Sequence, residues 1–431
     1  MPTITISDAA KHIGEDITIK GWLYNRRSSG RILFLQIRDG TGVMQAVLSE
    51  ADDAELFELA SRLSRETSLI VQGSVREDAR APIGCELQLT GLEVVHQPSE
   101  DFPIELKEQT PGFLMDHRHL WMRTGRQVPI LRIRDAVFRA FRDFFHERGF
   151  VATEAPILTG TSVEGTTTLF ELDYFGSKAY LGQSGQLYLE ATAMALGRVY
   201  WIGPAFRAEK SKTRKHVTEF WIAEAEMAYV EHAENMQIQE DLVRHIVTQV
   251  VEERAAELKQ LERDVDGLLA EVAKPFPRVD YADAVDLLSA AGHDVAFGDD
   301  FGAPEEAALG EHFGAPVFIE RFPIGMKPFY MQRDPEDRSR VLGADLIAPE
   351  GYGEIIGGSQ RVHSEEDLVA QLAEAGLPAE PYQWYIDLRR YGSVPHSGFG
   401  MGLARVIMWI CGTSHIREVI PFARQIHRLY P

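Results

Sequence analysis

A cationic loop between two apolar runs is the part of the chain whose residue types most clearly suit chemistry. The first run, Tyr200–Phe206, ends beside Arg207 and Glu209, and the second begins at Phe220. The basic side chains between them are Lys210, Lys212, Arg214, Lys215 and His216. Guanidinium groups match phosphate oxygens two at a time, and an aromatic ring offers a flat face for a base. The segment predicts either a polyphosphate site or a β-hairpin with a solvated basic tip.

A glycine-alternating segment near the C-terminus helps to decide between these interpretations. Gly398, Gly400 and Gly402 alternate with apolar side chains, and Arg405 follows at the start of an apolar helical run. Period-two alternation is typical of a β-strand, and positions without a side chain let a ligand or another backbone approach closely. Paired with the cationic loop upstream, this strand favours the polyphosphate site.

The two segments together resemble motifs 2 and 3 of the class II aminoacyl-tRNA synthetases. The amphipathic run Ile133–Gly149, followed by Phe150–Pro156, is a candidate for motif 1, and the order and spacing fit over nearly the whole chain. The resemblance implies an α+β fold whose catalytic domain has an antiparallel sheet flanked by helices, and a homodimer through motif 1. Four phenylalanines in motif 1 would suit either that interface or a monomer core: Phe138, Phe141, Phe144 and Phe145.

The same resemblance implies an ATP site in which catalysis is mostly positioning and neutralisation of phosphate charge. Arg207 would hold the α-phosphate and the carboxylate of the amino acid. Glu209 and Phe220 would address the adenine by hydrogen bonding and stacking. His216 and Arg405 would grip the β- and γ-phosphates, so Arg207 and Arg405 are the expected catalytic residues.

Two carboxylates, Asp345 and Glu354, imply a Mg²⁺ site by the same resemblance. They flank a turn that leads into a glycine-rich run, and Mg²⁺ takes few protein ligands while keeping waters and phosphate oxygens. The chain departs from the family at Ala404, where a glutamate usually precedes the motif 3 arginine. This change removes a hydrogen-bond partner or a local charge and leaves Arg405 in place, which puts full activity in doubt.

The run that ends at Glu190 bears on the choice of amino acid. In aspartyl enzymes the comparable run ends in Tyr-Lys-Gln, and the lysine pairs with the substrate carboxylate, whereas this chain has Leu189 and Glu190 there. Glu190 would repel aspartate but accept hydrogen bonds from a carboxamide, and Arg361 can donate to the carboxamide oxygen. Gln186 joins this expected substrate set. Glu164, in what the family uses as a mobile loop, is either a ligand of the α-ammonium group or a surface acid.

These features favour the asparaginyl branch of the family, with ATP, Mg²⁺, asparagine and tRNA(Asn) as cofactor and partners. The runs Gly353–Arg361 and Asp387–Gly400 look like that branch, whereas Val362 and His363 resemble the aspartyl pattern. The alternatives are an aspartyl-tRNA synthetase, including one that also charges tRNA(Asn), and an enzyme that amidates free aspartate without tRNA. A non-catalytic paralogue is disfavoured because the phosphate and metal residues are present.

Residues 1–96 predict a self-contained β domain. Five alternating apolar runs are separated by one helical stretch, Ala51–Leu63, between the third and fourth: Ile17–Tyr24, Ile32–Ile37, Val43–Leu48, Ser68–Val75 and Glu86–Val95. This order suggests an OB-fold barrel. Residues 97–125 are predicted as a linker and residues 126–431 as the catalytic domain.

Three residues of the barrel are candidates for reading RNA. OB-folds stack bases on aromatic rings while arginines hold the backbone, and Phe34 and Gln45 are expected on adjacent strands. The local sequence is similar to the anticodon-binding domain of aspartyl- and asparaginyl-tRNA synthetases, which implies that Phe34, Gln45 and Arg27 read the central anticodon uridine. The alternative makes Phe34 a core residue and the arginines solvent-facing.

Composition sets the wider limits. The chain has 431 residues, enough for two or three domains, and its formal net charge of −21 argues against indiscriminate nucleic-acid binding. A specific RNA held by local arginines stays compatible with that charge. Cys85 and Cys411 are expected to be buried thiols. No run predicts a signal peptide or a membrane span, so no membrane partner and a cytoplasmic location are expected.

Overall fold

The computed structural model describes the chain except for residues 82, 165–167 and 212, so the predicted loop residue Lys212 lies outside the described residues. The chain forms two compact units, Met1–His117 and Arg118–Pro431. The division falls within the segment 97–125 that the sequence predicts as a linker. Two short helices lie in that segment, α2 (Pro111–Asp116) and α3 (Arg118–Trp121).

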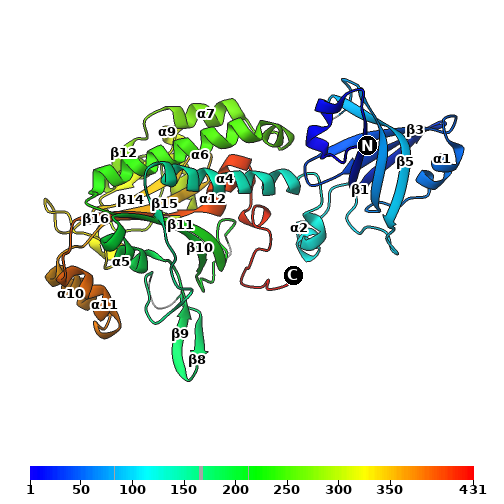
Figure 1. The fold of residues 1–431 in the computed structure, drawn as a ribbon. Coiled ribbons are helices and arrows are strands. Elements are labelled where there is room, and N and C mark those ends of the chain that lie inside the picture. Colours follow the sequence, from blue (N-terminus) through cyan, green and yellow to red (C-terminus); the bar gives the residue numbers. More distant parts are fainter. Residues whose placement is uncertain (82, 165–167, 212) are drawn as a thin grey trace. The chain divides into compact units, whose positions relative to one another are not determined.

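The first unit is a closed barrel with strand order β1-β2-β3-β5-β4 (Figure 1). A 3₁₀-helix, Ile6–His12, precedes the barrel. The barrel elements are β1 (Asp16–Ser29), β2 (Ile32–Arg38), β3 (Val43–Ser49), α1 (Ala54–Ser61), β4 (Ser68–Glu77) and β5 (Cys85–His96). The five strands and the helix between the third and fourth confirm the predicted OB-fold pattern. Leu33, Leu35 and Ile37 of β2 face the core because side chains alternate along a strand.

The second unit is built on a sheet of order β12-β13-β14-β15-β16-β11-β10-β6. Neighbouring strands are antiparallel except β12 with β13 and β6 with β10. The strands are β6 (Val151–Ala152), β10 (Arg198–Phe206), β11 (Glu219–Ala228), β12 (Arg278–Asp280), β13 (Val317–Glu320), β14 (Gly343–Ala348), β15 (Gly353–Arg361) and β16 (His396–Gly402). A smaller sheet has the order β7-β9-β8, with β7 (Leu158–Thr159), β8 (Glu171–Tyr174) and β9 (Ser177–Leu181).

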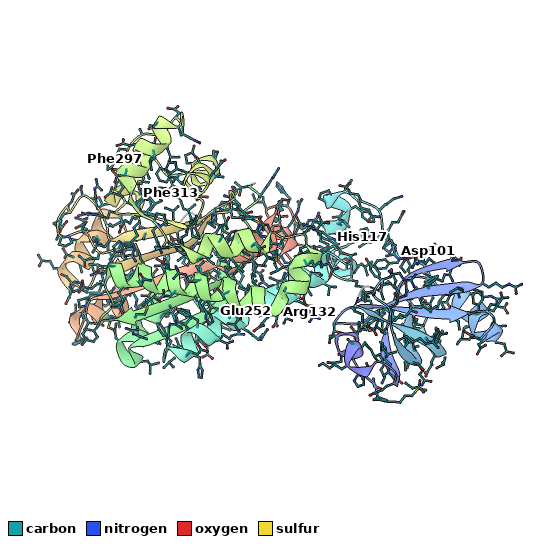
Figure 2. The ribbon with its side chains drawn as sticks, turned by 90° about the horizontal axis from the view of Figure 1, so that it is seen from above. Asp101, His117, Arg132, Glu252, Phe297 and Phe313 are labelled. Atoms are coloured by element: carbon teal, nitrogen blue, oxygen red, sulfur yellow. The ribbon has the colours of Figure 1, made fainter. Side chains whose placement is uncertain are left out.

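Helices flank the large sheet, as predicted. They are α4 (Gln127–Glu147), α5 (Gln186–Leu196), α6 (His232–Gln260), α7 (Val265–Ala273), α8 (Tyr281–Ala290), α9 (Ala303–Phe313), α10 (Glu365–Glu374), α11 (Gln383–Arg390) and α12 (Leu403–Cys411). In Figure 1, α4 and α6 lie along one face of the sheet and α5 lies on the other. Figure 2 shows Arg132 of α4 and Glu252 of α6 on neighbouring helices, and Phe313 at the end of α9. No helix of the described residues is both long enough and apolar enough to cross a membrane.

The motif 1 helix α4 buries most of its aromatic side chains within the single chain. Phe141, Phe144 and Phe145 are fully buried, and Phe145 stacks on Tyr200 of β10 with ring centroids 5.3 Å apart. Phe138 is only half-buried, and its ring lies 5.9 Å from that of the exposed Trp221. Three of the four phenylalanines therefore serve the monomer core.

The predicted strand, loop and strand of motif 2 are present as the hairpin β10–β11. The two strands pair from Arg198 with Met227 to Phe206 with Glu219. On β11, Phe220, Ile222 and Glu224 share one face because side chains alternate along the strand. That face carries the candidate site.

Candidate active site

A cavity of about 850 Å³ lies in the second unit. It gathers the site residues that the sequence predicts for the catalytic domain, with the exception of Glu190: Glu164, Gln186, Arg207, Glu209, His216, Phe220, Asp345, Glu354, Arg361 and Arg405. They come from segments that are far apart in sequence, so their convergence is a result of the fold. Buried charged groups that converge in a cavity are typical of a functional site.

Arg207 follows β10 and faces the cavity from the edge of the hairpin. Its guanidinium lies 5.5 Å from the ring centroid of Phe220 and 3.7 Å from a carboxylate oxygen of Glu164. Its Nε atom is buried and has no hydrogen-bond partner among the described residues. A guanidinium with an unused donor is suited to an anionic ligand such as a phosphate.

Two further nitrogen-bearing side chains of motifs 2 and 3, His216 and Arg405, line the same cavity. His216 lies 3.9 Å from Glu209, and burial together with Arg405 lowers the pKa of the imidazole. Arg405, in the first turn of α12, donates to the backbone oxygen of Glu354 at 2.7 Å. Of the remaining basic loop residues that are described, Lys215 lines the cavity and pairs with Glu306 at 3.3 Å.

The carboxylates of the two predicted metal ligands, Asp345 and Glu354, approach the same space beside Gly357. A Cβ at Gly357 would lie 3.0 Å from Glu354 Oε1 and 3.6 Å from Asp345 Oδ1. The other carboxylate oxygens are held by cations, Asp345 Oδ2 by Lys327 at 2.5 Å and Glu354 Oε2 by Arg405 at 3.5 Å. Burial raises the pKa of Asp345 to about 6, and Lys327 opposes the shift.

This arrangement fits Mg²⁺, which accepts two carboxylates and completes its shell with water and phosphate oxygens. The described residues contain no cluster of three or more His, Cys, Asp or Glu that could hold a metal ion. A metal here would therefore depend on oxygen ligands from a bound nucleotide as well as from Asp345 and Glu354.

Carboxylates line the part of the cavity next to α5. Glu164 accepts a hydrogen bond from the Tyr330 hydroxyl at 3.2 Å. Glu224 accepts from the Ser184 hydroxyl and from the Gly185 amide, the latter at 2.7 Å. Burial raises the pKa of Glu224 to about 7, and the hydrogen bonds from Ser184 and Gly185 oppose this shift. These acids suit a positively charged group such as an α-ammonium.

Arg361 enters the cavity as half of a buried ion pair. Its Nη2 lies 2.5 Å from Glu226 Oε1 and its Nε lies 3.3 Å from Glu226 Oε2. Gly398 of β16 pairs with Glu226 of β11, and a Cβ at Gly398 would lie 2.1 Å from the Glu226 carboxylate. The glycine of motif 3 therefore leaves the space that the Glu226 carboxylate occupies.

The structure does not bring Glu190, which the sequence predicts as a substrate residue, to the lining of the cavity. Glu190 is fully buried and does not line the cavity; Gln186, one helical turn earlier, lies between. The Glu190 carboxylate forms hydrogen bonds with the side chains of Gln186, Tyr385, Arg389 and His396. Leu189 is also fully buried, in an apolar cluster with Trp201 and Ile222.

Sequence reasoning missed several residues of the site, namely Ser184, Glu224, Glu226, Lys327 and Tyr330. A usable signal exists for the two glutamates. They alternate with alanines in an otherwise apolar strand, Phe220–Met227, which places two acids on the inward face. Buried acids on a strand need partners or a function. For Lys327 and Tyr330 the sequence offers no comparable pattern.

The predicted RNA-reading residues lie together on the barrel of the first unit. Arg27 pairs with Phe34 across β1 and β2, and its guanidinium lies 4.5 Å from the ring centroid. Arg27 also donates to Gln45 at 3.2 Å. Phe34 is only half-buried and is not part of the apolar cluster that fills the barrel. The structure thus places Phe34 outside the core, beside a cation and an amide.

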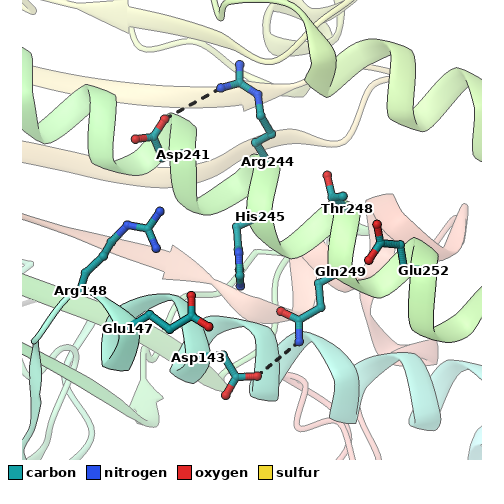
Figure 3. Close-up of a pocket in the computed structure, with 9 residues that line it drawn as sticks. All are labelled: Asp143, Glu147, Arg148, Asp241, Arg244, His245, Thr248, Gln249 and Glu252. Carbon is teal, nitrogen blue, oxygen red and sulfur yellow. Dashed lines mark hydrogen bonds and ion pairs between the residues drawn. The ribbon is translucent and has the colours of Figure 1, made fainter.

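A second hollow, between α4 and α6, contains none of the predicted site residues (Figure 3). Its lining mixes charges of both signs, including Asp143, Arg148, Asp241 and His245. Several of these groups satisfy one another, as Gln249 does by donating to Asp143 at 3.3 Å. The geometry gives this hollow no defined ligand.

Comparisons with known proteins agree with the cavity and the barrel. Residues 111–426 match the family described as tRNA synthetases class II (D, K and N), and residues 17–96 match the OB-fold nucleic acid binding domain. The asparagine–tRNA ligase of Pelotomaculum thermopropionicum is 56% identical over 432 residues, the full length of both chains.

Solved structures give the same picture. Asparaginyl-tRNA synthetase from Pyrococcus horikoshii, complexed with asparaginyl-adenylate, has a TM-score of 0.95 at 42% identity and covers 99% of each chain. The Entamoeba histolytica asparaginyl-tRNA synthetase in complex with asparaginyl-adenylate has a TM-score of 0.91 at 31% identity, over 100% of this chain and 99% of that one. This chain belongs to the class II aminoacyl-tRNA synthetases of the D, K and N group. It is an aminoacyl-tRNA ligase, and ATP is its expected energy source.

Proposed function

We propose that the chain is an asparagine–tRNA ligase, which activates asparagine with ATP and transfers it to the 3′ end of tRNA(Asn). The observation that carries this proposal is one cavity that combines Arg207 and Arg405, the arginines that would bind phosphate, with the ion pair Arg361–Glu226. The names of the similar proteins described above support the same amino acid and the same tRNA.

The ion pair explains the choice of a neutral side chain. Arg361 can donate to the oxygen of a carboxamide. Its charge is already compensated by Glu226 in a bidentate contact, so the pair presents no net cation to the carboxylate of aspartate. Burial in a low dielectric strengthens this discrimination, because an unpaired carboxylate next to Glu226 would be costly.

In the first step, an oxygen of the asparagine carboxylate attacks the α-phosphorus of ATP and pyrophosphate leaves. Arg207 would hold the α-phosphate and the attacking carboxylate, while His216 and Arg405 would hold the β- and γ-phosphates. Glu209 and Phe220 would take the adenine. Fixed donors aimed at developing phosphate charge need no reorganisation in the transition state.

Asp345 and Glu354 would hold Mg²⁺ at the polyphosphate, where the ion supplies neutralisation of phosphate charge. On the amino-acid side, Glu164, Glu224 and Gln186 would receive the α-ammonium group. In the second step, a ribose hydroxyl at the tRNA 3′ end attacks the acyl carbon of the adenylate and AMP leaves.

The barrel would supply recognition of the anticodon. Phe34 offers a ring for stacking, and Gln45 and Arg27 offer groups for a base edge and the backbone. We also propose a homodimer through motif 1. The short edge strand β6 in motif 1 and the residues directly after motif 1 expose apolar side chains, with Val151 41%, Ile157 46% and Leu158 43% exposed.

The decisive experiment is ATP–pyrophosphate exchange with each of the twenty amino acids, followed by aminoacylation of tRNA(Asn) and tRNA(Asp). Asparagine should drive exchange far better than aspartate, and tRNA(Asn) should be charged. Equal or better exchange with aspartate would assign the chain to the aspartyl branch. Formation of free asparagine without tRNA would assign it to an amidating enzyme.

A further inference from the structure

A fully buried polar network lies directly behind the amino-acid side of the cavity. Both carboxylate oxygens of Glu190 accept from the Tyr385 hydroxyl at 2.8 Å. Glu190 Oε2 also accepts from Arg389 Nη2 at 2.5 Å and lies 3.0 Å from His396 Nε2. Side chains of Glu190 and Arg389 are 0% exposed. These partners come from α11 and β16, so the fold converges on this one carboxylate.

The network keeps Glu190 in its charged form. Burial alone would raise the pKa of this carboxyl, but Arg389 and His396 hold the pKa well below its usual range. A carboxylate has no proton and can only accept hydrogen bonds. Any group that contacts Glu190 must therefore present a donor.

This restriction fixes the orientation of the Gln186 amide. Gln186 lies on α5 one turn before Glu190 and donates through Nε2 to Glu190 Oε1 at 3.1 Å. The start of α5 is held as well, because the Gln186 amide nitrogen donates to Ser184 Oγ at 3.0 Å. Because the Gln186 NH₂ group points to Glu190, its carbonyl oxygen points away from Glu190, and Gln186 lines the cavity. A side-chain amide without such an anchor can rotate and present NH₂ instead.

We propose that Glu190 is a positioning residue, which locks the Gln186 amide so that an acceptor oxygen faces the donor groups of the bound amino acid. The inference rests on the proposed function, because it specifies how the same cavity receives asparagine. Glu190 does not touch the substrate and acts through Gln186. Loss of Glu190 should weaken binding of the amino acid and leave binding of ATP unchanged. The side chains that would bind the phosphates, Arg207, His216 and Arg405, are not part of the network.

The test compares E190D and E190Q with the parent enzyme in ATP–pyrophosphate exchange. E190D keeps the charge that Arg389 and His396 face but shortens the side chain by one methylene, which removes the contact to Gln186. E190Q removes the charge. Both should raise the KM for asparagine about ten-fold, the effect of one lost charge-assisted hydrogen bond, while the KM for ATP stays within about twofold.

A matched control is E240Q, in the same unit. Glu240 is 5% exposed and accepts from Arg244 at 2.8 Å, so this variant also loses a buried carboxylate next to an arginine, but it lies on α6 outside the cavity lining. Its KM for asparagine should stay within about twofold of the parent. Circular dichroism and thermal unfolding identify the folded variants.

The double variant E190D/Q186M separates positioning from general support of the fold. If Glu190 acts through the Gln186 amide, adding E190D to Q186M should leave the KM for asparagine unchanged relative to Q186M alone. Multiplicative effects would overturn the proposal, as would a folded E190D enzyme with the parent's KM for asparagine. An E190D chain that does not fold would assign Glu190 to stability alone and also overturn it. If the parent does not exchange with asparagine, the proposed function itself fails.

Discussion

Three glutamates beside the cavity are almost completely buried, and they differ in their partners. Glu190 faces Arg389, and Glu226 faces Arg361, each in a close ion pair. Among the described residues, the donors to Glu224 are the neutral Ser184 hydroxyl and Gly185 amide. A buried carboxylate without a cation in contact is costly to ionise. The charge of Glu224 therefore depends on pH near neutrality.

Replacement of Glu224 by glutamine should stabilise the protein at high pH. An unfolded glutamate titrates near about 4.3, whereas the pKa of Glu224 in the folded state is about 7, so the folded state binds more protons between these values. The stability that protonated Glu224 contributes is present below about pH 4 and is lost as the pH rises through about 7. E224Q does not titrate and should gain up to about 3 kcal/mol over the parent at pH 8.

Urea unfolding at pH 5 and pH 8 measures this difference. Near pH 5 the two proteins should differ little, because Glu224 is then mostly protonated in the folded parent. E224Q should also bind asparagine more weakly at pH 8, since the carboxylate for the α-ammonium group is gone. A stability difference that is the same at both pH values would contradict the assignment of this titration to Glu224.

Removal of the Arg207 guanidinium should slow adenylate formation strongly. R207A loses preorganised donors to the α-phosphate, which are worth about 3 to 4 kcal/mol, or about 10²–10³-fold in rate. The matched control is R214A, an exposed arginine of the same loop that does not line the cavity. Single-turnover pyrophosphate release measures both variants. If R207A stays within about twofold of the parent, Arg207 does not contact the α-phosphate.

At the scale of elements, the alternation of side chains along single strands explains how each unit separates its core from its site. On β2, Leu33, Leu35 and Ile37 fill the barrel, so Phe34 faces outward toward Arg27. On β11, Phe220 and Glu224 face the cavity. A strand can thus present functional groups on one face while the other face or the neighbouring residues secure the fold.

Phe34→Ala should impair charging of tRNA without changing adenylate formation. The variant removes a stacking surface worth roughly 1–3 kcal/mol per base. Aminoacylation should fall about ten- to a hundred-fold, mainly through the KM for tRNA. W22A is a matched control, because Trp22 is another aromatic residue of the barrel and is 39% exposed. A folded F34A enzyme that charges tRNA normally would exclude Phe34 from anticodon reading, and loss of folding would return it to the core.

At the scale of the whole molecule, the burial of α4 limits how many apolar side chains of motif 1 are available for an interface with a second copy of the chain. Phe141, Phe144 and Phe145 are fully buried in the core of the single chain. The apolar side chains left for a partner are those of β6 and the residues after it, together with the half-buried Phe138 and exposed Trp221. An edge strand with exposed apolar residues is a natural place for association.

Ile157→Asp should shift the proposed dimer toward monomer. Ile157 is 46% exposed, so a carboxylate there costs the single chain little but would be buried in the interface. Sedimentation velocity over a concentration series measures the change. V369D, on α10, is the control, since Val369 is 41% exposed and lies outside motif 1. A parent that is monomeric at all concentrations, or an I157D dimer of unchanged affinity, would rule out this interface.

The sequence by itself determined the strand and helix order of the barrel and, in the second unit, the elements of motifs 1, 2 and 3, because alternation and helical spacing are local properties of the chain. It also identified the residues of motifs 2 and 3, from Arg207 to Arg405, since a cationic loop and a glycine-rich strand are contiguous signals. The same alternation divided each barrel strand into two faces. It did not decide whether the face of Phe34 turns inward, because a single aromatic residue is compatible with either the core or the surface until the barrel is assembled.

Only the tertiary structure decided which buried charges meet. The pairing of Glu226 with Arg361 joins β11 to β15, and that of Glu190 with Arg389 joins α5 to α11. The contact of Lys327 with Asp345 likewise depends on a long-range approach. How deeply each side chain is buried could not be predicted from the sequence either. Gln186 and Glu190 share one helical face and differ only in what packs over them. Partners and depth are set by packing between distant segments, which local patterns do not encode.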